Sequence, residues 1–232
     1  MHILLTRPLE DCHELILKFQ SLGHEVSHLP LINIEGLKYE PLNYSEFGGI
    51  IFTIANAVKF TDIKNIDKKT ACFCVGSATE KKARSSGFQN VFAADGNVDN
   101  LKELILLNFN SSEGKLLYIS GEVISSNLDQ DLISNGYTIE RIINYKAKSI
   151  EKYDEDFIEK LKQKMPEITY IYSQNSAINF LKMIKNYKLE TSWMNTNLMC
   201  IGEKTSSILN EIKWKKIFLF NPGEEEFLLY KI

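Results

Sequence analysis

The feature that most constrains the fold is a ten-residue pattern that occurs twice. Residues 51–60 read Ile-Phe-Thr-Ile-Ala-Asn-Ala-Val-Lys-Phe, and residues 171–180 read Ile-Tyr-Ser-Gln-Asn-Ser-Ala-Ile-Asn-Phe. In each copy an apolar, β-rich run ends in a hydroxyl residue, Thr53 or Ser173, and a helical pattern follows. Such a strand-to-helix turn presents backbone N–H groups that the helix cannot satisfy itself. We therefore expect an α/β fold whose site is lined by two equivalent halves.

Two further matches in the chain extend this pattern to a whole repeat. The sequence Cys-Val-Gly-Ser-Ala-Thr at 74–79 is similar to Cys-Ile-Gly-Glu-Lys-Thr at 200–205, and the glycine turn at 22–26 corresponds to the one at 135–139. A unit repeated in this way indicates a tandem duplication. Strand and helix patterns alternate, which predicts parallel sheets with right-handed crossovers. The predicted fold class is α/β, with two similar parallel-sheet domains.

Two polar stretches without periodicity, 35–48 and 146–156, predict linkers. A plain tandem would give domains at 1–110 and 115–232. The linkers favour another division, in which 49–145 forms a domain inserted into a first domain made of 1–34 plus 157–232. The first domain would then be discontinuous, and the two linkers would form a two-segment hinge. We expect a strand over 26–34 in the first domain and a last helix that opens at 222–226.

Composition narrows the function class. The length of 232 residues suits two small α/β domains or one large one, and the 44% of hydrophobic and 25% of charged residues are typical of a globular protein. No apolar run reaches the ~20 residues that span a bilayer, and the first residues lack a basic leader, so we expect a cytoplasmic protein with no membrane contact. The net charge of −3 argues against non-specific nucleic-acid binding. An anionic ligand would therefore depend on local donors.

The cysteines and histidines predict neither a disulfide nor a metal site. Cys12, Cys72, Cys74 and Cys200 form no C-x-x-C pair and lie in apolar segments, so we expect them in the core. His24 and His28 are four residues apart, but on a predicted strand, where this spacing gives no tight metal pair.

An ordered set of motifs along the whole chain resembles the uroporphyrinogen-III synthase family. The set comprises Leu-Thr-Arg-Pro at 5–8, residues 52–58, Val-Gly-Ser-Ala-Thr at 75–79, Asn-Tyr-Lys-Ala at 144–147, Tyr-Ser at 172–173 with Ser-Ala at 176–177, and Ile-Gly at 201–202 with Thr205.

The resemblance implies two α/β domains, the first discontinuous, joined by a two-stranded ladder. It implies a lyase of the tetrapyrrole pathway to haem, which converts hydroxymethylbilane into uroporphyrinogen III. Water is lost, the ring closes, and ring D is inverted by way of a spiro intermediate. The resemblance implies no cofactor, and we expect a monomer. A transient contact with the upstream hydroxymethylbilane synthase is a further expectation.

The resemblance and the turn pattern together give the expected site residues. Tyr145 is the expected catalytic residue, since a neutral phenol can donate a proton or a hydrogen bond to the leaving hydroxyl. The expected substrate-binding residues are Arg7, Thr53, Asn56, Gly76, Ser77, Thr79, Ser120, Ser173, Ser176, Gly202 and Thr205. Their turns would present N–H groups to the substrate carboxylates, and the protein would mainly hold the substrate in a reactive geometry.

The chain departs from the family pattern at three of these turns. Ile54 stands where a serine is usual, the Ser-Gly-Glu turn at 120–122 lacks an arginine that is often found there, and Glu203 introduces an acid. These departures bear on the side-chain assignments more than on the fold.

Structural roles compete with each of these assignments. Tyr145 could be a packed tyrosine at a strand end, Arg7 could pair with an acid to close the hinge, and the threonines and Ser173 could cap helices. A two-domain protein that binds a small anion without catalysis would also explain the duplication and the turns. A response-regulator module lacks its acidic cluster here, and a dinucleotide-binding enzyme lacks the G-x-G-x-x-G turn.

Overall fold

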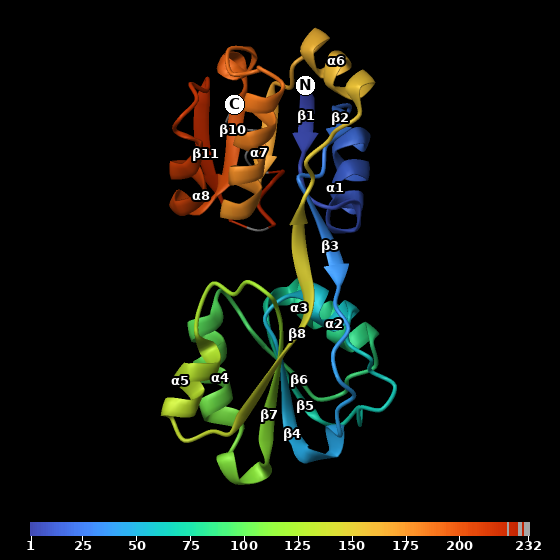
Figure 1. Ribbon diagram of the computed structural model, residues 1–232, viewed down its shortest axis with the longest axis vertical. Coiled ribbons are helices and arrows are strands. Elements are labelled where there is room, and N and C mark those ends of the chain that lie inside the picture. Colours follow the sequence, from blue (N-terminus) through green and yellow to red (C-terminus); the bar gives the residue numbers. More distant parts are fainter. Residues whose placement is uncertain (222, 227–228, 230–232) are drawn as a thin grey trace. The chain divides into compact units, whose positions relative to one another are not determined.

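The computed structural model describes residues 1–221, 223–226 and 229 (Figure 1). The chain divides into two compact units, Met1–Asn33 with Lys148–Ile232 (unit 1) and Ile34–Ala147 (unit 2). The boundaries fall within strands β3 (Ile32–Gly36) and β8 (Ile139–Ser149). β8 therefore continues through the first residues of the expected linker 146–156. The expected division into domains 1–34 plus 157–232 and 49–145, with linkers at 35–48 and 146–156, stays a prediction.

Unit 1 is built on a five-stranded parallel sheet with the strand order β11-β10-β9-β1-β2. The strands are β1 (His2–Leu5), β2 (Glu25–His28), β9 (Ile168–Ile171), β10 (Asn197–Ile201) and β11 (Lys216–Phe220). The helices are α1 (Leu9–Ser21), α6 (Glu155–Gln163), α7 (Gln174–Asn186) and α8 (Gly202–Leu209), with a 3₁₀ turn η3 at Ser192–Asn195. The central strands are buried on both faces and read as continuous apolar runs, as expected for a parallel sheet.

Helices cover both faces of the unit 1 sheet. On one face α6, α7 and α8 pack over the sheet around Trp193, which is fully buried and lies edge-on to Phe180 with ring centroids 4.9 Å apart. On the other face α1 packs through Cys12 and Phe19, and the Phe19 ring stacks on Tyr170 at 5.8 Å. This two-sided cover is typical of a doubly wound α/β fold.

Unit 2 is built on a six-stranded sheet with the order β3-β8-β7-β4-β5-β6. The pairs among β8, β7, β4, β5 and β6 are parallel. Its remaining strands are β4 (Phe47–Phe52), β5 (Ala71–Val75), β6 (Val91–Ala94) and β7 (Lys115–Gly121). Its helices are α2 (Ala55–Lys59), α3 (Gly76–Ser85), α4 (Val98–Asn108) and α5 (Leu128–Ser134), with 3₁₀ turns η1 (Tyr44–Glu46) and η2 (Ser111–Glu113).

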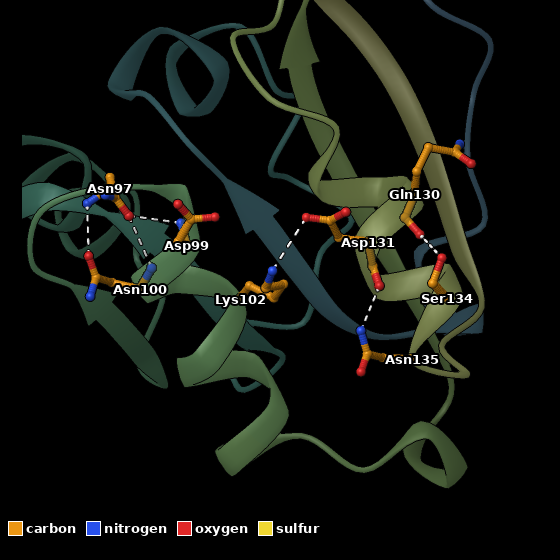
Figure 2. Close-up of polar contacts among 8 residues, drawn as sticks. All are labelled: Asn97, Asp99, Asn100, Lys102, Gln130, Asp131, Ser134 and Asn135. Atoms are coloured by element: carbon orange, nitrogen blue, oxygen red, sulfur yellow. Dashed lines mark hydrogen bonds and ion pairs between the residues drawn. The ribbon is translucent and has the colours of Figure 1, made fainter.

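The two faces of the unit 2 sheet carry separate cores. One core includes residues of α2 and α3, and the other includes residues of α4 and α5. Figure 2 shows how α4 and α5 are held: Asn97 forms a capping box with Asn100 at the start of α4, and Lys102 pairs with Asp131 of α5 at 3.4 Å. A capping box satisfies two otherwise unpaired N–H groups, so the start of α4 is fixed by its own residues.

The sequence repeat maps onto the two sheets in an unexpected way. The segment from β9 to β11 matches the segment from β4 to β6, and the segment from β1 to β2 matches the segment from β7 to β8. With these matches, β11-β10-β9-β1-β2 and β6-β5-β4-β7-β8 are the same spatial order. In unit 1, however, the two-strand piece precedes the three-strand piece in the chain, and in unit 2 it follows it. Each unit therefore combines pieces from both copies of the repeat.

One predicted strand is wrong. The expected strand over 26–34 is divided into β2, which ends at His28, and β3, which starts at Ile32 and joins the other sheet. Pro30 lies in the break, and proline lacks the N–H that a central strand donates to its neighbour. Of the expected helix opening at 222–226, Pro222 lies outside the described residues, and residues 223–226 form turns and not a helix. Across the described part of the chain, no helix is long and apolar enough to cross a membrane.

Candidate active site

The strand orders define a topological switch point in each unit. In unit 1 the chain leaves the adjacent strands β1 and β9 toward opposite edges of the sheet, and in unit 2 it leaves β4 and β7 in the same way. Doubly wound sheets bind ligands at the carboxyl ends of the strands beside such a point. Arg7 and Ser173 follow the unit 1 pair, and Thr53 and Ser120 lie at the ends of the unit 2 pair.

In unit 1 the switch point carries a cation on an aromatic ring. The Arg7 guanidinium carbon lies 4.8 Å from the centroid of the Tyr172 ring, and Arg7 Nη2 lies 3.9 Å from Asp11 Oδ2, one turn into α1. Arg7 thus pairs with an acid of the adjoining helix, and the side chain is 38% exposed. Burial raises the pKa of Tyr172 above its ordinary range. Tyr172 therefore stays neutral and serves as a packing surface for the cation.

Ser173 and Ser176 are bonded to each other at the start of α7. Ser173 is the N-cap residue: its Oγ accepts from the Ser176 backbone N–H at 3.1 Å and donates to Ser176 Oγ at 2.9 Å. Ser176 is only 4% exposed. The capping alternative considered for Ser173 is therefore present in the structure.

The equivalent turn in unit 2 is built differently. Ile54, not Thr53, is the N-cap residue of α2, and no side chain caps this helix. Thr53 Oγ1 lies 3.4 Å from the hydroxyl of Tyr118, which is buried in the centre of β7. Asn56 lies in the first turn of α2 and is 8% exposed. The uncapped N–H groups of this turn adjoin a hydroxyl pair at the switch point.

Tyr145 lies against Gly121 at the carboxyl end of β7. The two residues are paired in register, after a shift between Ser120 and Gly121 that leaves Asn144 as an extra residue in β8. A Cβ at Gly121 would lie 2.6 Å from Cζ of Tyr145 and 2.8 Å from its hydroxyl oxygen, so the ring rests on a space that only glycine leaves. Burial, with a smaller contribution from Tyr118, raises the pKa of Tyr145 to about 12. The phenol is therefore protonated at neutral pH and able to donate.

Asn144 fixes this irregularity in β8. Its side-chain nitrogen donates to the carbonyl oxygen of Ala57 at 2.8 Å and to Thr61 Oγ1 at 3.1 Å, which ties β8 to the end of α2. Asn144 is fully buried. It is a positioning residue for the segment that carries Tyr145.

Sequence reasoning missed one cation at this edge. Arg141 of β8 donates from Nε to Ser120 Oγ at 2.8 Å and from Nη2 to the Gly121 carbonyl oxygen at 3.0 Å. The turn at 120–122 was expected to lack a cation because its own sequence has none. The sequence of the turn could not reveal this cation, because the guanidinium belongs to the neighbouring strand β8.

The two Gly-x-x-Thr turns share one geometry. Gly76 and Gly202 have φ values of +76° and +70°, and each opens a helix without a side-chain cap. Such φ values favour glycine. Ser77 is exposed, whereas Thr79 and Thr205 are each 4% exposed and lie one turn inside their helices. The threonines are therefore not capping residues; Val75 and Ile201 occupy those positions.

Among the described residues, no group of three or more His, Cys, Asp and Glu side chains could hold a metal ion. The four cysteines are free and buried, and burial raises the pKa of each thiol, to about 11 for Cys12 and Cys74 and about 12 for Cys200. They are core residues, as the sequence predicted.

Comparisons with known proteins agree with this architecture. The family model described as uroporphyrinogen-III synthase HemD matches residues 13–219. The porphyrin biosynthesis protein HemD of Ruminiclostridium josui is 25% identical over an alignment of 222 residues, and the match covers 88% of this chain and 42% of that protein. The chain thus spans less than half the length of this curated relative.

Two solved structures share the fold. A uroporphyrinogen-III synthetase from Helicobacter pylori is 21% identical with a TM-score of 0.66, covering 100% of this chain and 99% of that one. A mutant uroporphyrinogen III synthase from Thermus thermophilus is 12% identical with a TM-score of 0.55, covering 100% and 97%. With the family match over most of its length, the chain belongs to the uroporphyrinogen-III synthase family.

Proposed function

We propose that this protein is a uroporphyrinogen-III synthase, which cyclises hydroxymethylbilane to uroporphyrinogen III with loss of water and inversion of ring D. The observation that carries the proposal within this family is the phenol of Tyr145. It rests on Gly121 at the carboxyl end of β7, beside the switch point of unit 2, and remains protonated at neutral pH.

Tyr145 is proposed as the catalytic residue. The bond between carbon and the leaving hydroxyl breaks as the phenol, first hydrogen-bonded to that oxygen, transfers its proton to it, and water departs. The electrons come from the substrate itself, whose pyrrole rings are electron-rich. The substituted carbon of ring D then attacks the carbon that lost the hydroxyl, which gives the spiro intermediate. The bond from this ring carbon to its original methylene bridge then breaks, and the bridge rejoins ring D at the free α-carbon. The proton lost from that carbon balances the one given to the leaving water and restores the phenol.

The substrate carboxylates are proposed to bind at the strand ends of both units. The uncapped starts of α3 and α8 offer N–H groups at Gly76, Ser77 and Gly202, where the helix dipole also favours anions. The further proposed contacts are Arg7, Thr53, Asn56, Thr79, Ser120, Ser173, Ser176 and Thr205. Of these, the turns supply donors through the backbone, and Arg7 supplies a charge.

The protein is proposed to act as a cytoplasmic monomer without a cofactor, with the stretches 35–48 and 146–156 as a two-segment hinge between the domains. Size-exclusion chromatography with light scattering tests the monomer, and limited proteolysis tests the hinge. A dimer, or cleavage confined to other loops, would contradict these parts. A transient contact with hydroxymethylbilane synthase is tested by cross-linking during turnover.

The decisive experiment generates hydroxymethylbilane with its upstream synthase, adds this protein, oxidises the products and separates the isomers. Spontaneous closure gives the type I isomer, so an excess of type III is expected from the wild-type protein. Tyr145→Phe is expected to lower the rate of type III formation by roughly 100-fold or more, as for loss of a general acid.

Tyr137→Phe is the matched control for this variant. Tyr137 also carries a bonded hydroxyl, which donates to the Phe109 carbonyl oxygen at 2.8 Å, but it precedes the amino end of β8. Its loss should leave the isomer ratio unchanged. If Tyr145→Phe still forms the type III isomer at the wild-type rate, substrate positioning and not the phenol accelerates the reaction. Type I alone, from folded wild-type protein, would refute the proposed activity and favour a binding protein.

A further inference from the structure

The guanidinium of Arg141 lies at the carboxyl end of β7 in unit 2. Its backbone pairs in register with Tyr118 of β7. Its guanidinium nevertheless bonds Ser120 and Gly121, which lie further along that strand, at 2.8 and 3.0 Å. The side chain therefore extends in the strand direction toward the switch point between β4 and β7, where doubly wound sheets bind their ligands.

This guanidinium has no acidic partner within the described residues. The chain has three arginines. Arg7 lies 3.9 Å from Asp11 and Arg84 lies 2.8 Å from Glu80, but Arg141 forms no ion pair with any carboxylate of the described chain. Asp129 of α5 acts on the neighbouring Tyr118 phenol without pairing with Arg141. A partly buried guanidinium that forms no ion pair is a site that an anion would complete.

The geometry of the bonded groups leaves the useful donors available. Arginine has five N–H donors in a planar fork. One on Nε and one on Nη2 are used by Ser120 and Gly121, both neutral acceptors. The Tyr118 ring lies beside the guanidinium, whose central carbon is 5.9 Å from the ring centroid. Ser120 and Gly121 thus fix the fork in place while its outer edge keeps the pair of parallel donors that a carboxylate accepts.

We infer that Arg141 binds a carboxylate of the substrate at the carboxyl end of β7. The inference rests on the proposed function for the identity of the substrate, but not for the class of ligand, which is a carboxylate. Ser120 and Gly121 act as positioning residues for the guanidinium. The anchored carboxylate would lie beside the strand end that also carries Tyr145, because Gly121 contacts both side chains.

The competing explanation is that Arg141 only braces β8 against the end of β7. The two explanations predict different losses. A brace contributes to stability and can be lost without a change in anion affinity. A carboxylate anchor contributes to binding, so its loss raises KM and weakens an anionic ligand while the fold remains.

The test compares Arg141→Gln with Arg84→Gln. Arg84 is a close match, because it too bonds one side chain, Glu80 at 2.9 Å, and one backbone carbonyl oxygen, that of Val91 at 3.1 Å. In the isomer assay, Arg141→Gln is expected to raise KM roughly 10- to 100-fold, the usual range for a charge-assisted hydrogen-bonded contact, with a smaller change in kcat. Arg84→Gln should leave KM unchanged. Arg141→Lys should recover only part of the loss, because an ammonium cannot reproduce the fork.

A second readout does not depend on turnover. Uroporphyrin, an octacarboxylate, is titrated into each protein and binding is followed by porphyrin fluorescence at two salt concentrations. Arg141→Gln should raise Kd roughly tenfold or more and flatten the salt dependence. An unchanged Kd and KM with a lower melting temperature would overturn the inference in favour of the brace.

The two proposals fail separately. Type III formation by the wild type with an unaltered KM in Arg141→Gln would overturn the inference and keep the activity. Arg141-dependent uroporphyrin binding by a wild-type protein that yields only the type I isomer would keep the anion anchor and refute the activity.

Discussion

Substitution of Gly121 by alanine should displace Tyr145 and abolish most of the proposed activity. The added methyl group would lie 2.6 Å from Cζ, 2.8 Å from Cε2 and 2.8 Å from the hydroxyl oxygen of the Tyr145 ring. Gly121 is not among the residues with positive φ, so alanine introduces no backbone strain there. Any loss of stability or activity in Gly121→Ala therefore comes from the contact between the new methyl group and the Tyr145 ring.

The size of the displacement follows from these distances. Non-bonded carbon atoms settle at roughly 3.5–4.0 Å, so the ring must move by about 1 Å. The ring also stacks on Phe60, with centroids 6.5 Å apart, and Phe60 itself lies close to Gly36, where a Cβ would be 2.6 Å from its ring. A well-packed site that must take an extra methyl group loses roughly 1–3 kcal/mol of stability.

The activity should fall further than this stability loss alone would suggest. A misplacement of about 1 Å can cost roughly 100-fold in rate, because the donor no longer meets the leaving oxygen. The expected result for Gly121→Ala is a kcat for type III formation close to that of Tyr145→Phe. The melting temperature should fall by about 2–4 °C for each kcal/mol lost.

A double-mutant cycle gives the control. In a Tyr145→Ala background the methyl group at position 121 meets no ring, so its stability cost should largely disappear, with a coupling energy of roughly 1–2 kcal/mol. Full type III activity in Gly121→Ala would refute the reasoning, since it would show either that the ring is not held at Gly121 or that its hydroxyl is not needed.

Three further predictions concern the turns and the tyrosines. Ser173→Ala should lower the stability of unit 1 by roughly 1 kcal/mol through loss of the α7 cap, as measured by urea unfolding. Ser173→Thr should retain most of this stability, and equal losses in both variants would contradict the capping role. Gly202→Ala should cost roughly 1–2 kcal/mol from backbone strain alone, because φ is +70° and nothing lies within 4 Å of the new Cβ, and Gly202→Asn should cost less; an alanine variant as stable as the wild type would exclude strain. Burial raises the pKa of both Tyr145 and Tyr153 to about 12, above the ordinary value of about 10, so the folded state keeps protons that the unfolded state releases. The free energy of unfolding should therefore be unaffected below pH 10 and fall as the pH rises toward 12. Urea unfolding between pH 8 and pH 11 should show a shallower fall of this free energy after Tyr145→Phe and Tyr153→Phe.

The α/β class and the strand-to-helix turns could be predicted because they depend on local patterns. The apolar runs that end in Thr53 and Ser173, and the glycines at 76 and 202, are signals that a single stretch carries. Buried thiols were predictable for the same reason. Each such feature needs only the residues next to it.

The features that escaped prediction depend on neighbours distant in sequence. Arg141 reaches the Ser120 turn because β8 pairs with β7, and Gly121 matters because Tyr145 rests on it. The division of residues 26–34 at Pro30 was readable in principle, but its result, two strands in two different sheets, required the topology. A cap at Ser173 was one of the alternatives that the sequence left open, but the difference from the matching turn, where Ile54 and not Thr53 is the N-cap residue, depends on a single side-chain hydrogen bond.

The exchange of pieces between the two repeats has a consequence for the order of folding. Unit 2 is continuous in sequence, so all its strands after β3 can pair before the C-terminal part of the chain has been synthesised. Unit 1 must wait, because β1 pairs with β9, and Ile3 lies beside Ile168.

The prior folding of unit 2 lowers the entropic cost of bringing β1 and β9 together. Its two ends leave through β3 and β8, which are neighbours in one sheet, and the Leu37 N–H donates to the Asn144 carbonyl oxygen at 2.8 Å. A folded unit 2 therefore acts as a clip that shortens the loop between β1 and β9 roughly threefold, which lowers its closure cost by about 1 kcal/mol. In this duplicated chain, the folding of the inserted unit 2 thus brings together the two sequence segments that form unit 1.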